Sequence, residues 1–187
     1  MSTWSRKRSV MRLYNLTAQM YEERYCGEQE AKYKVALEGL RLSESSITLD
    51  VGCGSGLFFK HLSGATKMAL GVDISKQLLF IAKKRVENFP SAHLVLADAD
   101  HLPFRHSVFN HIFAFTVLQN MPNPLKTLNE TKRVARRDAY FVLTGLKGAI
   151  PQETFSAFLD HSNLKVISFR DDETIRCYIV VAIQNHK

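Results

Sequence analysis

The fold of this chain is decided by the stretch Leu49-Asp50-Val51-Gly52-Cys53-Gly54-Ser55-Gly56-Leu57. The β-branched pair Ile47 and Thr48 precedes it and predicts a short buried strand. The apolar residues that follow it have helical spacing: Phe58, Phe59 and Leu62. The glycines therefore lie at a strand-to-helix turn, where a ligand can approach the backbone because no Cβ fills the space. The helix behind the turn offers unpaired N–H groups and a positive dipole end.

Two classes of ligand compete for such a turn. A dinucleotide fold needs the pattern G-x-G-x-x-G or G-x-G-x-x-A, and the last position here is Leu57. The chain instead has G-x-G-x-G, with Asp50 two residues ahead of the first glycine. A carboxylate there suits a cationic amine or sulfonium better than a pyrophosphate. A glycine-rich turn that binds nothing is the remaining alternative.

The stretch resembles motif I of the class I S-adenosylmethionine-dependent methyltransferases, and the resemblance extends over residues 13–183. It implies an α/β, Rossmann-like fold with a doubly wound, mostly parallel seven-stranded sheet and an antiparallel last strand. It also implies S-adenosyl-L-methionine as the cofactor, bound at the turn by Asp50, Gly52, Cys53 and Gly54. In related enzymes a Tyr-rich N-terminal helix closes over the amino-acid end of the cofactor, and Tyr21 lies in the similar segment here.

The end of the second predicted strand supplies a carboxylate. Residues 68–72 are followed by Asp73, about twenty residues after Asp50, which is the usual distance for an acid that binds a ribose diol. Asp73 could instead cap the next helix, but Ser75 is the better cap. The resemblance places Ile74 against the adenine ring.

The third predicted strand, residues 93–97, is followed by Asp98 and Ala99. The resemblance assigns the adenine amino group to the Asp98 carboxylate and a ring nitrogen to the backbone N–H that follows it. Asp100 is a nearby acid that competes for this assignment. An ordinary Asx turn is the alternative for both acids.

The fourth predicted strand, residues 111–115, ends at Phe115 and Thr116, which would face the transferred methyl group because ligands bind at the carboxyl ends of parallel strands. Gln119 and Asn120 either hydrogen-bond a substrate or cap the turn. No Asn/Asp-Pro-Pro-Tyr or Pro-Cys signature follows, which counts against two classes of nucleobase and amide chemistry. A hydroxyl or carbon acceptor would need a base, and the candidates are also ordinary surface or packed residues: His101, His106 and His111.

The composition is that of a globular protein. The chain has 187 residues, of which 45% are hydrophobic, enough for one domain with a real core. No apolar run approaches the length of a membrane span. Three widely spaced cysteines indicate neither a disulfide framework nor a zinc site, and no other metal-ligand cluster is apparent. A reducing, cytoplasmic setting follows.

The formal net charge of +7 is unevenly distributed. Four basic residues precede the first acid, so residues 1–12 are predicted to form a basic N-terminal tail, and residues 13–187 a single domain that starts with helices within 13–40. Further basic groups lie at 83–85 and 132–137. They are either solvated helix faces or an electrostatic footprint for RNA. A transit peptide is a third interpretation of the start.

Three functions remain open. The first is a methyltransferase that acts on tRNA, rRNA or a translation component, which the basic tail and an expected open cleft favour. The second is a small-molecule methyltransferase of the quinone or sterol type, against which the short segment 145–150 counts. The third is a non-catalytic methyltransferase-like subunit, against which the intact candidate carboxylates and glycines count.

A partner is implied by the resemblance as well. Some relatives work with a small zinc-binding activator subunit. The third strand would lie at the edge of the sheet in this fold, and its apolar segment Leu94-Val95-Leu96 would offer unpaired backbone groups to a partner strand. The sequence therefore predicts that an activator could pair with this edge.

Overall fold

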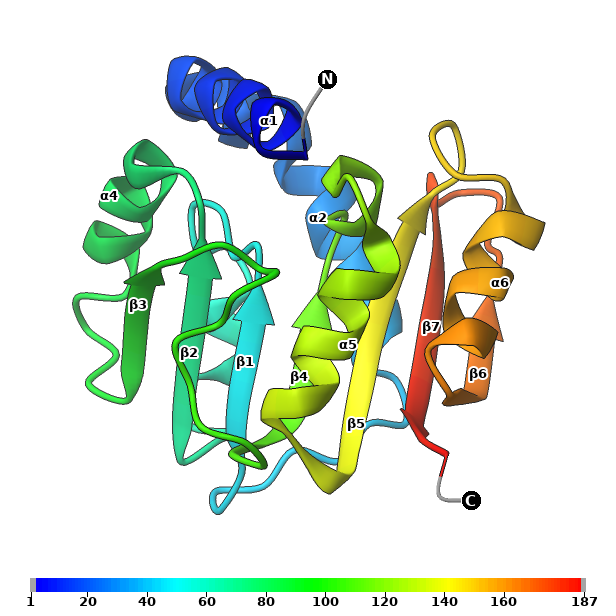
Figure 1. The fold of residues 1–187 in the computed structure, drawn as a ribbon. Coiled ribbons are helices and arrows are strands. Elements are labelled where there is room, and N and C mark those ends of the chain that lie inside the picture. Colours follow the sequence, from blue (N-terminus) through cyan, green and yellow to red (C-terminus); the bar gives the residue numbers. More distant parts are fainter. Residues whose placement is uncertain (1–2, 186–187) are drawn as a thin grey trace.

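A computed structural model describes residues 3–185, apart from the side chains of residues 21–26. One seven-stranded sheet runs through it in the order β3-β2-β1-β4-β5-β7-β6. Only β7 runs antiparallel to its neighbours β5 and β6, which confirms the predicted fold class (Figure 1). The strands are β1 Ile47–Val51, β2 Met68–Asp73, β3 Ala92–Leu96, β4 Phe109–Ala114, β5 Ala135–Leu146, β6 Leu164–Arg170 and β7 Cys177–Gln184.

Helices cover both faces of the sheet because side chains alternate between the faces along each central strand. On one face, α5 (Pro124–Val134) and α6 (Gln152–His161) pack on a core that includes Leu49 and Ile112. On the other face, α2 (Tyr21–Leu37) and α3 (Phe59–Leu62) pack on Phe113 and its neighbours. The helix α4 (Lys76–Arg85) contacts β2 and β3.

Two helix starts follow directly from local sequence. The Ser75 hydroxyl accepts a hydrogen bond from the Leu78 N–H at 3.2 Å, which confirms Ser75 as the N-cap of α4. The Asn123 side chain accepts one from the Lys126 N–H at 3.2 Å, and Pro124 follows it at the first position of α5. Both caps hold the loops that connect the sheet edge to the next helix.

The N-terminal boundaries differ from those predicted. Helix α1 spans Thr3–Thr17, so the expected basic tail at 1–12 is wrong over residues 3–12, which are helical. A single turn of 3-10 helix, η1 (Ala18–Met20), separates α1 from α2. Exposed arginines and serines on its outer side hide the helical period of α1. Figure 1 shows α1 lying across the carboxyl ends of the strands.

None of the helices in residues 3–185 is long and apolar enough to cross a membrane.

Candidate functional site

A solvent-open pocket of about 700 Å³ lies at the carboxyl ends of the parallel strands, beneath α1. Nine of the predicted site residues line it: Gly52, Gly54, Asp73, Ile74, Asp98, Ala99 and Phe115, with Thr116 and Asn120 at the exit of β4. Residues that are far apart in the sequence are therefore brought together where the sequence predicted, while their individual roles stay predictions.

The glycine turn is shaped for close approach of a ligand. The N–H groups of Gly52 and Cys53 both donate to the carbonyl of Val72, at 2.8 and 3.0 Å, which pins the turn to the end of β2. Gly52 has a φ of +71°, and a Cβ built on it would lie 2.5 Å from Cγ2 of Val117. A side chain at position 52 would therefore be strained and would collide with the pocket wall.

Asp73 braces this turn as well as lining the pocket. Its Oδ2 accepts from the Gly54 N–H at 2.9 Å, and its Oδ1 accepts from the Ser75 N–H at 2.7 Å. Burial raises the pKa of Asp73, and the backbone N–H groups only partly offset that effect. Each oxygen keeps a second lone pair, so the carboxylate can still accept hydrogen bonds from a ligand diol.

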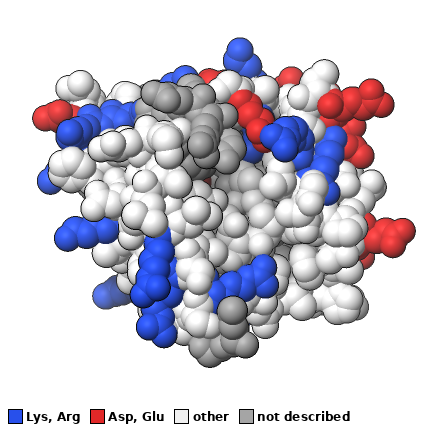
Figure 2. Space-filling model, turned by 90° about the horizontal axis from the view of Figure 1, so that it is seen from above, with Lys and Arg blue, Asp and Glu red and all other residues white. Residues whose placement is uncertain are grey.

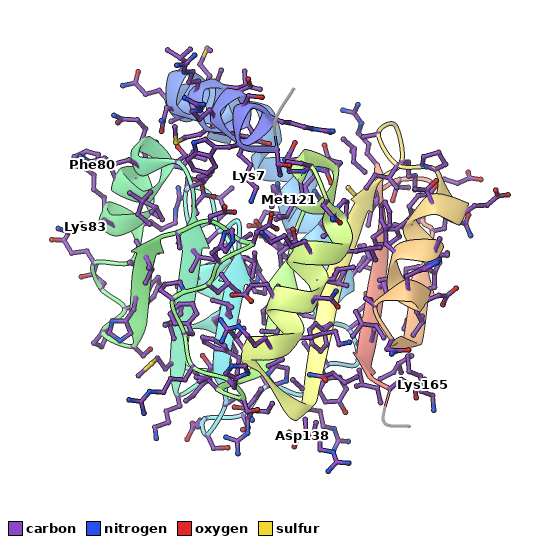
Figure 3. All side chains as sticks on the ribbon, in the orientation of Figure 1. Lys7, Phe80, Lys83, Met121, Asp138 and Lys165 are labelled. Atoms are coloured by element: carbon purple, nitrogen blue, oxygen red, sulfur yellow. The ribbon has the colours of Figure 1, made fainter. Side chains whose placement is uncertain are left out.

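Asp98 and Asp100 are bound by a residue that the sequence did not single out. The Lys7 ammonium, on the inner side of α1, donates to both oxygens of Asp98 at 2.7 Å and to Oδ2 of Asp100 at 2.5 Å. Burial would raise the pKa of Asp98, but the Lys7 hydrogen bond and the Asp100 N–H outweigh it, so the pKa is lowered. Figure 3 shows Lys7 projecting from α1 towards the middle of the sheet edge.

Asp98 forms an Asx turn and also lines the pocket. The Asp98 carboxylate accepts the backbone N–H of Asp100 at 3.0 Å, two residues further on. Asp100 itself is buried beneath the pocket floor, where the Thr127 hydroxyl donates to it at 2.5 Å. Asp100 does not line the pocket, which agrees with the choice of Asp98 over Asp100.

Thr116 holds an unusual backbone conformation at the exit of β4. Its φ is +61°, which is rare for a β-branched residue, and hydrogen bonds to two neighbours hold it in place. The Thr144 hydroxyl accepts the Thr116 N–H at 2.7 Å. The ammonium of Lys32, a buried residue of α2, donates to the Thr116 hydroxyl at 2.9 Å. Strain of this kind persists only where surrounding contacts enforce it, and it is concentrated at functional sites.

Gln119 and Asn120 both cap the turn at Thr116. The Gln119 amide donates to the Thr116 carbonyl at 2.7 Å, and the Asn120 amide donates to the same carbonyl at 3.2 Å. Asn120 also lines the pocket and donates to the Tyr14 hydroxyl at 3.1 Å, whereas Gln119 does not reach the pocket. The structure therefore separates the two candidates, and only Asn120 is placed to meet a ligand.

Asp50 and Cys53 lie in a smaller cavity on the other side of the glycine turn, which they share with Gln29, Tyr33 and Phe115. Burial and the nearby Asp73 raise the pKa of Asp50 well above its usual range. Within the described part of the chain, no cation forms an ion pair with Asp50. Burial also raises the pKa of the Cys53 thiol, so Cys53 remains protonated.

One predicted residue lies outside the described side chains. Tyr21 is the first residue of α2, and its side chain is not placed. Sequence reasoning missed the pocket residues that α1 contributes, namely Lys7, Val10 and Tyr14. Their spacing of three and four residues is a helical signal that could have identified them. Among the described residues no group of His, Cys, Asp and Glu could hold a metal ion.

Comparison with known proteins agrees with this geometry. The family model described as a methyltransferase domain matches residues 49–143, which is about half of the chain. This part contains the glycine turn and the carboxyl ends of β1, β2, β3 and β4. The chain belongs to the class I S-adenosylmethionine-dependent methyltransferases. S-adenosylmethionine is the cofactor of this family.

Curated relatives of the chain are longer proteins. A malonyl-[acyl-carrier protein] O-methyltransferase from a Marinomonas species is 29% identical over 154 residues, which is 81% of this chain and 57% of the relative. A demethylmenaquinone methyltransferase from Staphylococcus saprophyticus is 32% identical over 106 residues, which is 55% of this chain and 46% of the relative. The chain thus spans about half the length of these two relatives.

A solved structure shares the fold over nearly its whole length. It belongs to the complex between the Haloferax volcanii Trm112 methyltransferase activator and a methyltransferase. The TM-score is 0.78 at 16% sequence identity, and the match covers 92% of this chain and 98% of the other. At that identity the likeness concerns the fold alone.

Proposed function

We propose that this chain binds S-adenosylmethionine in the pocket beneath α1 and transfers its methyl group to a small, largely apolar acceptor. The observation that carries the proposal is the set of carboxylates at three strand ends around the glycine turn: Asp50 as the last residue but one of β1, Asp73 as the last residue of β2 and Asp98 two residues after β3. Asp50 is buried and has no ion-pair partner among the described residues, which fits a cationic group on the ligand. Gly52 has a positive φ and leaves room for Val117 in the pocket wall, so the turn can keep its tight bend beside the ligand.

The chain's own residues would orient the two reactants. Bound S-adenosylmethionine supplies an electrophilic methyl group on a sulfonium, which an acceptor lone pair can attack in line. Asp50 would pair with the amino group, Asp73 would accept hydrogen bonds from the ribose diol, and Asp98 would accept from the adenine amino group. Thr116 and Asn120, at the exit of β4, would then face the acceptor.

The pocket wall supports an apolar acceptor. Apolar side chains that line the pocket include Val10 of α1 and, after β4, Val117 and Met121. Figure 3 shows Met121 pointing into the space beneath α1, close to Lys7. The relative named for demethylmenaquinone favours such an acceptor. The relative named for a malonyl-[acyl-carrier protein] is also not named for a nucleic acid.

An RNA or translation-component acceptor, the first expectation from the sequence, has less support. That expectation depended on an open cleft, and α1 lies over the cleft and is tied to its floor by Lys7. The basic residues of α1 and α4 still favour a polyanion, so RNA belongs in the test as a competing acceptor.

The decisive experiment supplies methyl-labelled S-adenosylmethionine with three acceptor pools in parallel: lipid extract, acyl-carrier thioesters and bulk RNA. We expect label in lipid or in the carrier thioester. Asp50→Ala should abolish labelling, whereas Glu87→Ala, which removes an exposed carboxylate after α4, should leave labelling unchanged. Label confined to RNA would overturn the apolar acceptor. Absence of cofactor binding by calorimetry would instead favour the non-catalytic subunit.

We also propose that the β3 edge pairs with a small zinc-binding activator. Within residues 3–185 no strand pairs with the outer edge of β3, and Leu96 there is 57% exposed. The opposite edge, β6, is interrupted by an irregularity between Val166 and Ser168, which makes it the poorer template. The activator-bound Haloferax structure adds weak support. Co-expression with candidate activators should give a stable heterodimer. If the isolated chain is stable and fully active, the proposal of an activator is contradicted.

A further inference from the structure

The outer side of α1 is both basic and apolar. Leu13 and Leu16 are 58% and 83% exposed there, and Arg12 is exposed between them. The inner side, with Lys7, faces the pocket. No acidic residue occurs anywhere in α1. Exposed leucines beside basic groups are of interest because apolar patches rimmed by polar residues mark protein or membrane interaction sites.

The neighbouring helix α4 has the same character. Phe80 is 59% exposed, the ammonium of Lys84 lies 4.9 Å above its ring, and Lys83 is exposed beside it. Figure 3 shows Phe80 and Lys83 pointing outwards, away from the sheet. Like α1, α4 contains no acidic residue.

The two helices form one continuous surface. Asn15 of α1 accepts hydrogen bonds from the Ser75 hydroxyl at 2.7 Å and from the Gln77 N–H at 3.2 Å, so α1 docks on the N-terminus of α4. Helical spacing puts Trp4 and Arg8 on the same side of α1 as Asn15, and Trp4 is 49% exposed. Arg12 and Leu16 continue this stripe at steps of four residues, whereas Leu13 lies further round the helix. We call the α1–α4 face the surface made by Trp4, Arg8, Arg12, Leu16, Phe80, Lys83 and Lys84.

We propose that the α1–α4 face binds an anionic lipid surface. A helix with Lys and Arg on one part of its surface and Trp, Phe or Leu beside them lies in the plane of a membrane interface, with its apolar groups below the headgroups and its cations against the phosphates. The absence of acids from both helices provides the charge complementarity. Figure 2, the view onto α1, shows basic groups over the left and lower parts and acidic groups mainly towards the right.

An aliphatic side chain decides between a lipid surface and a nucleic acid. Trp4 and Phe80 could stack on bases, but Leu16 has no comparable role on a phosphate backbone. It gains by leaving water for an apolar layer. This binding is independent of methyl transfer, so it goes beyond the proposed function and can be tested without a known acceptor.

The chain contains a single tryptophan, and it lies on this face. Vesicles of phosphatidylglycerol and phosphatidylcholine, and vesicles of phosphatidylcholine alone, should be titrated into the full chain while Trp4 fluorescence and co-sedimentation are followed. We expect a blue shift and sedimentation with the anionic vesicles only, both of which weaken as salt is raised because the cations are screened.

Two variant pairs separate this face from general stickiness. Leu16→Glu should weaken vesicle binding at least tenfold, whereas Ile167→Glu, which changes a 54% exposed residue on β6, should leave it unchanged. Arg12→Glu should weaken it more than Lys165→Glu, which lies at the far side of the sheet in Figure 3. Equal effects within either pair would overturn the proposal. A second outcome would also overturn it: the chain does not sediment with vesicles but binds bulk RNA, and Leu16→Glu reduces that RNA binding.

Discussion

The Lys7 ammonium lies 2.7 Å from both carboxylate oxygens of Asp98, although 91 residues separate the two in sequence. This contact ties α1 to the end of β3 and encloses the pocket from above. It also occupies the carboxylate that the family resemblance assigns to the adenine amino group. A carboxylate has about four acceptor sites, so Asp98 can serve both donors only if Lys7 gives up part of its present contact.

Removing the Lys7 charge should loosen α1. Lys7→Met leaves Asp98 and the buried Asp100 without their cation, and hydrogen bonds to charged groups contribute about 1.5–3 kcal/mol. We therefore expect amide hydrogen exchange within α1 to become about tenfold faster or more. Arg8→Met, an exposed cation one position along the same helix, is the control and should change little. Equal protection in both variants would show that the ion pair does not hold α1.

Acid should weaken the same contact. The pKa of Asp98 is lowered in the folded state, so the unfolded chain binds more protons as the pH falls below about 4. The stabilisation is fully present above that pH and is lost as the pH falls towards the folded pKa. Unfolding free energies measured by urea between pH 6 and pH 3 should fall less in Asp98→Asn than in the wild type. Parallel curves would contradict this assignment.

Asp73→Ala should weaken binding of S-adenosylmethionine. The lost ribose hydrogen bonds and the loss of the Gly54 and Ser75 braces together remove about 1–3 kcal/mol, which is roughly a 5- to 150-fold increase in Kd. Isothermal calorimetry measures it, and thermal melting distinguishes loss of binding from loss of fold. Asp138→Ala, an exposed carboxylate at the opposite end of the sheet in Figure 3, should bind the cofactor normally. Unchanged affinity in Asp73→Ala would mean that the ribose contact is misassigned.

Position 52 should tolerate a methyl group much less well than position 64. Gly52 and Gly64 have φ values of +71° and +72°, so alanine is strained at both. Only at position 52 does the added Cβ meet Val117, whereas nothing lies within 4 Å of it at position 64. Gly52→Ala should therefore lose about 1–3 kcal/mol more unfolding free energy than Gly64→Ala. Similar losses, measured by urea denaturation, would indicate that the turn shifts to accept a side chain.

His111 should make the protein less stable in mild acid. Burial lowers its pKa, an effect that the Arg41 carbonyl and Asp138 oppose only in part. The unfolded chain then takes up a proton that the folded chain resists, so unfolding free energy falls as the pH drops below about 6.5. His111→Phe, which keeps a ring between Phe113 and Tyr140, should flatten the profile between pH 7.5 and pH 5. The exposed His106→Ala is the control, and an unaltered profile in His111→Phe would refute the assignment.

Short-range patterns were sufficient for most of the fold. Short apolar and β-branched runs identified the strands, Ser75 marked a helix start, and the glycine turn located the pocket. The N-terminal boundary was missed because a helix whose outer side carries arginine and serine reads as a polar tail. Thr116 was a candidate by position alone, since its positive φ depends on Thr144 and Lys32, which lie 28 residues after it and 84 residues before it.

The sequence by itself determined the positions of the main strands, the bend at Gly52 and the carboxylates at the strand ends. These features depend on residues that are neighbours in the chain. Only the tertiary structure showed that Lys7 of α1 reaches the pocket and binds the Asp98 carboxylate, and that α1 and α4 carry adjacent basic and apolar side chains. The reason is that ion pairs and exposed faces depend on which distant segments pack together, and local periodicity does not encode that packing.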